Sequence, residues 1–105
     1  MNTNRVIQTL PAVKEECVLF VSQKKQVQLK EIAYWAVVQH LDYDKSWETM
    51  TVTIRPIISE PLGYKLVEDN RIVAVKVNGS QKELEKEYAK EIKTVIAKLE
   101  EHDNE

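Results

Sequence analysis

The stretch SQKELEKEYAKEIKTVIAKLEEH, residues 80–102, carries the clearest structural pattern in the chain and decides the predicted fold. Its apolar residues recur at spacings of four, four, three and four residues, at Leu84, Tyr88, Ile92, Val95 and Leu99. Such spacings form the apolar stripe of an amphipathic helix. The pattern predicts one continuous helix over residues 80–102.

The start of this helix and the surface that it covers also follow from the sequence. Asn78 and Gly79 form a turn pair, and Ser80 with Glu83 three residues later forms a capping box, which makes Ser80 the expected N-cap. A helix of this length is about 34 Å long at ~1.5 Å per residue. It should therefore cross the whole chain, with its apolar stripe packed on a broad surface such as a sheet.

The composition is that of an ordinary globular protein. The chain has 105 residues, of which 43% are hydrophobic and 30% charged, and it contains three prolines and two glycines. This length favours a single domain over residues 1–105. The sequence has no apolar run of membrane-spanning length, and its first residues lack the apolar core of a signal peptide, so we expect a cytoplasmic protein without membrane attachment.

The distribution of charge argues against a DNA-binding domain. The net charge is −2, and the acidic excess lies at the C-terminal end, where residues 100–105 are expected to form a frayed acidic tail. The one cysteine, Cys17, has no partner for an internal disulfide and lies in the apolar run 17–21. We expect a buried, unreactive thiol there.

The N-terminal half gives a mixed pattern. Residues 1–14 fit either an extended arm or a short helix, and residues 16–23 fit a buried strand. Residues 27–43 are ambiguous, because their apolar spacing is helical while their composition is rich in Val, Tyr and Trp. The spacing favours a helix over residues 27–33, and the part from Tyr34 onward stays open. As a strand, the segment would form a hairpin with the next one through residues 44–46.

The second half predicts mainly strands. In residues 47–55, Met50, Val52 and Ile54 alternate with polar residues, as in a half-buried strand whose apolar face these three form. The prolines at 56 and 61 should confine residues 57–60 to a sheet edge or a loop.

The segments 64–67 and 71–77 should form a hairpin through residues 68–70, with Val73, Val75 and Val77 facing the helix. The predicted fold is α+β, a small antiparallel sheet of three to five strands with a long C-terminal amphipathic helix packed on one face.

The sequence contains no assembled catalytic or metal-binding set. His40, Asp42 and Asp44 lie close together in sequence and could line a small hydrolase or ligand pocket, but a structural histidine beside a solvated turn is the simpler interpretation. One cysteine and two histidines, one of them His102 in the expected tail, do not make a zinc site. We therefore predict a protein that is not an enzyme and has no cofactor or metal.

Binding residues are expected among the aromatic and basic side chains of the predicted sheet. The candidates are Tyr34, Trp35, Tyr43, Trp47, Arg55 and Arg71. Aromatic and basic residues together would suit single-stranded nucleic acid, but ten basic and nine acidic side chains in residues 1–77 give little attraction for phosphate. The leading hypothesis is a small binding or regulatory protein that acts through protein–protein interaction and self-associates as a homodimer. Single-stranded nucleic-acid binding is the alternative.

Overall fold

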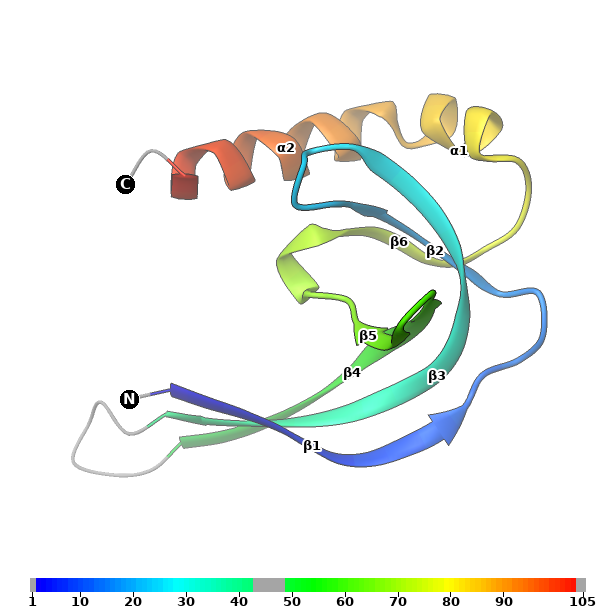
Figure 1. The fold of residues 1–105 in the computed structure, drawn as a ribbon. Helices are drawn as coiled ribbons and strands as arrows, with labels where there is room; N and C mark the ends of the chain where they lie inside the picture. The colour runs from blue at the N-terminus through cyan, green and yellow to red at the C-terminus, as the bar shows by residue number, and fades with distance from the viewer. Residues whose placement is uncertain (1, 43–48, 104–105) are drawn as a thin grey trace.

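The computed structural model describes residues 2–42 and 49–103, which form an antiparallel sheet followed by two α-helices (Figure 1). The described elements are β1 (Asn2–Pro11), β2 (Cys17–Val21), β3 (Val27–Asp42), β4 (Thr49–Glu60), β5 (Gly63–Leu66), the 3-10 helix η1 (Asp69–Arg71), β6 (Ile72–Val77), α1 (Gln81–Glu87) and α2 (Ala89–Asp103). The predicted α+β class is confirmed. The sheet has six strands in the described residues, more than the three to five expected.

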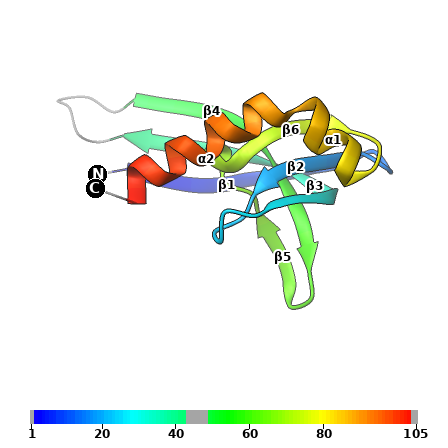
Figure 2. The same ribbon diagram turned by 90° about the horizontal axis from the view of Figure 1, so that it is seen from above.

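Strand β3 holds the sheet together. Its first part pairs with β2, and its second part pairs with β1 along one edge and with β4 along the other. The far edge of β2 then takes β6, and the end of β4 takes β5. The sheet curves along β3, so that the β2–β6 half lies beneath the helices while the other half bends away from them (Figures 1 and 2). We call the three-stranded part made by β1, residues 34–42 and residues 49–56 the arm.

The helix expected over residues 27–33 is wrong, because these residues begin the 16-residue strand β3. Its side chains find partners in distant segments: Leu29 lies opposite Leu19 of β2, and Ile32 lies opposite Ile58 of β4. This pairing outweighs the helical spacing, since strand preference depends on neighbours that are remote in sequence. Residues 44–46, expected to form a hairpin turn, lie outside the described residues.

The N-terminal segment is extended, which was one of its two expected conformations. Residues 2–11 form the ten-residue strand β1, and no helix occurs there. The strand pairs with β3 in two registers, separated by a bulge at Ile7 between Val6 and Gln8. Because Pro11 stands at the end of the strand, it does not interrupt the ladder.

The C-terminal helix begins as predicted but does not run as one piece. The hydroxyl oxygen of Ser80 accepts a hydrogen bond from the Glu83 N–H at 3.2 Å. The helix is interrupted at Tyr88, whose backbone angles are φ −105° and ψ 22°. Leu84 before the interruption and Ile92 after it are both buried in the same cluster.

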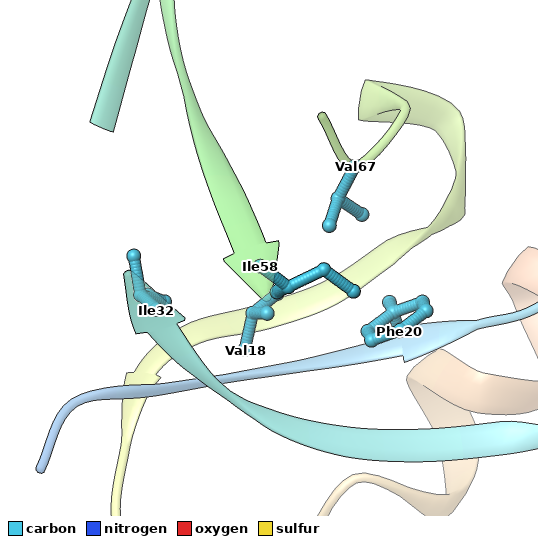
Figure 3. Packing of buried hydrophobic residues seen from close by; sticks show 5 residues of the cluster. All are labelled: Val18, Phe20, Ile32, Ile58 and Val67. Atoms are coloured by element: carbon cyan, nitrogen blue, oxygen red, sulfur yellow. The ribbon is translucent and has the colours of Figure 1, made fainter. Parts of the chain in front are cut away.

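The apolar side chains form two clusters on opposite faces of β2. On the helix side, Leu19 and Val77 pack with Leu84 and Ile92, so the predicted burial of the helix stripe against the sheet is confirmed. On the other side lies a cluster between the two halves of the sheet (Figure 3). Its buried members are Val18, Phe20, Ile32, Ile58 and Val67.

The residues of β4 alternate between its faces as predicted, but the predicted burial of the apolar face is wrong. Val52 and Ile54, expected to be its buried face, are 53% and 60% exposed, while Arg55 on the opposite face is only 9% exposed. The reason is that this part of β4 belongs to the arm, beyond the reach of the helices. Nor is the later part an edge or a loop, because β4 continues through Pro56 to Glu60 between β3 and β5.

The expected hairpin of residues 64–77 does not form. Strand β5 pairs with β4, strand β6 pairs with β2, and η1 connects them. Irregular register along β6 also changes which side chains share a face. Val73 and Val77 pack in the helix-side cluster as predicted, whereas Val75 lies near Trp35 and is 39% exposed.

Candidate functional site

The six predicted binding residues do not form one surface. Tyr34 and Trp35 lie on β3, Arg55 lies on β4, and Arg71 ends η1. The remaining two, Tyr43 and Trp47, lie outside the described residues. The structure therefore places four of the candidates, and each of the four has its own surroundings.

The two described aromatic candidates point to opposite faces of the sheet, because neighbouring residues of a strand alternate. The Tyr34 ring meets Tyr64 of β5 edge to face, with ring centroids 5.5 Å apart and planes at 75°. The Trp35 ring lies on the other face beneath Lys76, whose Nζ is 5.8 Å from the ring centroid. They do not make a continuous platform on which successive bases could stack.

Both arginine candidates are engaged by the fold. The Nε and Nη2 groups of Arg55 donate to the backbone carbonyl of Val67 at 3.1 and 2.9 Å. The Nη1 group of Arg71 donates to the carbonyl of Ser22 at 2.8 Å, and its Nε lies 3.4 Å from a Glu68 carboxylate oxygen. The two guanidinium groups thus fix the chain around η1 to β4 and to the end of β2.

The structure gives no geometric support to the hypothesis of a hydrolase site around His40. The Nδ1 atom of His40 lies 2.5 Å from the side-chain oxygen of Asn4, its cross-strand partner on β1. Asp44 lies outside the described residues, and the side chain of Asp42 is not described. Within residues 2–42 and 49–103, no group of three or more His, Cys, Asp and Glu side chains is placed to hold a metal.

Cys17 is half-buried at the start of β2 rather than deeply enclosed. Burial, and then the nearby negative charge of Glu31, raise the pKa of its thiol. A raised pKa keeps the group as a thiol at neutral pH, and the thiolate is the reactive form. The expected low reactivity of this cysteine therefore has a physical basis in its surroundings.

The feature that the sequence did not suggest is a hollow above Trp35. It has a volume of about 360 Å³ and lies between the arm and β6. Its lining residues are Leu10 of β1, Trp35 of β3, Ile54 of β4, and Val75 and Lys76 of β6. Four of the five are apolar, and the fifth is a cation.

The shape of β6 explains how Lys76 reaches this hollow. Cys17 of β2 pairs with Val77 and Val18 pairs with Val75, so Lys76 is an extra residue in a bulge. Its φ is 58°, in the left-handed region. Bulges of this kind redirect a side chain that regular alternation would place elsewhere. The only trace in the sequence is a lysine within a valine-rich strand, which does not reveal a bulge.

A second exposed feature is the outer edge of β4. Strand β5 pairs with Ile57–Glu60 only, so no described strand pairs with the outer edge of residues 49–55. The described side chains of residues 51–54 are all exposed. The outer edge of β1 is also unpaired among the described strands, but β1 carries the bulge at Ile7 and the charge of Arg5.

No protein-family model, curated protein or solved structure matches this chain. None of the described helices is both long enough and apolar enough to cross a membrane. The arguments for function that follow therefore depend on the geometry of the chain itself.

Proposed function

We propose that this chain is a non-enzymatic binding protein that acts through protein–protein interaction and pairs with a second copy of itself through the outer edge of β4. The observation that carries the proposal is the unpaired run of residues 49–55 with its exposed apolar side chains. An unpaired strand edge offers backbone N–H and C=O groups to another strand. Exposed apolar groups beside such an edge favour a protein partner.

The sequence of this edge suits pairing with itself. Residues 49–54 carry no charge and no proline, and β4 has no bulge opposite residues 34–42 of β3. If two copies meet antiparallel about Thr53, Val52 of one copy lies opposite Ile54 of the other, twice by symmetry. Cross-strand pairs of β-branched residues stabilise antiparallel sheets.

The outer edge of β1 is less suited than that of β4 to pair with a second copy. Its bulge at Ile7 interrupts the edge, and Arg5 would approach its own symmetry mate in several registers. Natural edges are protected by bulges, charges and prolines of this kind. When two copies pair about a two-fold axis, the free β4 edge of each copy is used, and the assembly closes as a dimer.

The overall dimensions show how far the arm extends from the rest of the chain. The Cα radius of gyration is 15.1 Å. A compact chain of this length has a radius of gyration of about 13 Å. The excess is explained by the arm, which extends away from the helices (Figure 1).

The test is the mass in solution of the wild type and two matched variants. The wild type should have twice the chain mass of 12.2 kDa by light scattering at micromolar concentration. Val52→Lys removes both symmetric contacts with Ile54, which should cost about 2 kcal/mol and raise the dimer Kd roughly thirtyfold.

The control is Val6→Lys, at a valine of β1 that is 46% exposed, close to the 53% of Val52. It should leave the mass unchanged. A wild type that stays monomeric throughout the concentration range would refute self-association. Dissociation by Val6→Lys alone would move the contact to β1.

The structure gives no specific support to the nucleic-acid alternative. Its two described aromatic candidates lie on opposite faces, and both arginines donate hydrogen bonds to backbone carbonyls. Single-strand binding needs stacking faces and cations together along one groove.

A further inference from the structure

The hollow above Trp35 has the composition of a ligand site for one class of molecule. Its four apolar residues come from four strands, β1, β3, β4 and β6, and its volume of about 360 Å³ lies within the ~300–1,000 Å³ of small-molecule sites. Leu10 and Trp35 are cross-strand partners, so their side chains share a face of the arm. Ile54 lies opposite Val37 on that same face.

The one charged lining residue is held in place by the backbone. Three non-glycine residues of the described chain have positive φ, namely Glu15, Lys25 and Lys76. Glu15 and Lys25 lie in turns, whereas Lys76 lies inside a strand. A residue with a Cβ rarely adopts this conformation, and such positions cluster at functional sites. Here the conformation accompanies a lysine ammonium group placed over the Trp35 ring.

The charged residues near the hollow favour a negatively charged ligand. The face of the arm that carries Trp35 also carries Arg5, which lies opposite Gln39. No described residue on this face of the arm is acidic. Within the described residues, neither Arg5 nor Lys76 forms an ion pair. Lys76 is thus the one charged residue that lines the hollow, and Arg5 lies farther along the same face of the arm.

We propose that the hollow binds an amphipathic carboxylate, a molecule with an apolar body of medium length and a single anionic head. The apolar body lies against Leu10, Ile54 and Val75, and the carboxylate accepts hydrogen bonds from Nζ of Lys76. A charge-assisted hydrogen bond to an ammonium group fixes the head, and apolar burial supplies most of the affinity. Ile54 belongs both to the hollow and to the proposed contact between copies, whereas Val52 does not line the hollow, so Val52→Lys tests self-association without changing the ligand site.

The test uses Trp35 as its own reporter. In a Trp47→Phe background Trp35 is the only tryptophan, so its fluorescence reports on the hollow. Decanoate, titrated below its micelle concentration, should change this fluorescence saturably. Butyrate, with a short apolar body, and decyltrimethylammonium, with the opposite charge, should each bind at least tenfold more weakly.

The matched variants are Lys76→Asn and Lys25→Asn. Asparagine tolerates positive φ, and both lysines have it, with φ of 58° and 62°. Lys76→Asn should weaken decanoate about tenfold and Lys25→Asn should not change it. As a second variant, Ile54→Ala should weaken decanoate while leaving the weak response to butyrate unchanged.

Three results would overturn the proposal. They are no saturable response to decanoate, equal binding of decyltrimethylammonium, and equal loss of affinity in the two asparagine variants. Repeating the titration in Val52→Lys separates this proposal from the previous one. Unchanged decanoate binding by a monomeric variant supports the ligand site, and a wild type that is monomeric yet binds decanoate refutes only self-association.

Discussion

Arg55 is the residue whose role differs most from the sequence expectation. Alternation along β4 places it beside exposed threonines, yet its side chain is buried and its guanidinium group donates two hydrogen bonds to the Val67 carbonyl. Val67 belongs to the cluster between the two halves of the sheet. Arg55 therefore links the arm to the segment that follows β5.

We expect Arg55→Leu to destabilise the protein by about 2–3 kcal/mol, because hydrogen bonds to a charged group are lost and a buried carbonyl loses its donor. Urea unfolding followed by circular dichroism measures this change. Arg5→Leu, at an exposed arginine of β1, is the control and should change stability by less than about 0.5 kcal/mol. Equal effects of the two substitutions would mean that the bonds to Val67 contribute nothing to stability.

Among the elements, the two helices have a start that neighbouring residues determine and an interruption that the neighbouring sequence does not predict. The start at Ser80 is set by neighbouring residues, and its cap hydrogen bond forms as the sequence predicts. The interruption at Tyr88 has no proline or glycine to announce it. Leu84 and Ile92, on either side of it, are nevertheless buried in the same cluster.

We expect Ser80→Ala to reduce the free energy of unfolding by about 1 kcal/mol, because the Glu83 N–H loses its acceptor. Thr94→Ala is the matched control within α2. The Thr94 hydroxyl only donates to the carbonyl of Lys90 in the preceding turn, and alanine favours the helix more than threonine does. The control should be neutral or slightly stabilising in thermal unfolding, and a loss as large as that of Ser80→Ala would contradict the capping role.

The sequence predicted those elements whose signals are local, and it failed where distant segments decide. The cap at Ser80, the buried run of β2 and the helix stripe depend on spacing within one segment. Strand β3 depends on partners in β1, β2 and β4, so its helical spacing was misleading. The candidate site failed for the same reason: Tyr34 and Trp35 were predicted, but the hollow needs Leu10, Val75 and Lys76, which only the folded chain brings together.

At the scale of the whole molecule, the arm is the part of the sheet that the helices do not cover. The extents of the chain are 48 × 36 × 25 Å, and the arm is the part of the sheet that curves away from the helices (Figure 1). A curved sheet of which the helices cover only one half explains both the exposed apolar residues of β4 and the hollow above Trp35.

We expect hydrogen exchange in the arm to depend on protein concentration. The outward-facing amides of residues 49–54 have no described strand partner, so in a monomer they exchange quickly, and pairing with a second β4 should slow them about tenfold or more. Exchange measured at high and low micromolar concentration tests this. The difference should disappear in Val52→Lys, and amides of β2 serve as the internal control, because β2 is paired on both edges. Identical exchange at both concentrations would argue against the paired edge.

The position of β2 between the two apolar clusters has a consequence for how the protein unfolds. Val18 and Phe20 belong to one cluster, and Leu19, the residue between them, belongs to the other. Displacing this short strand would dismantle both clusters at once. We therefore expect the helices and the curved sheet to unfold together in one cooperative, two-state transition.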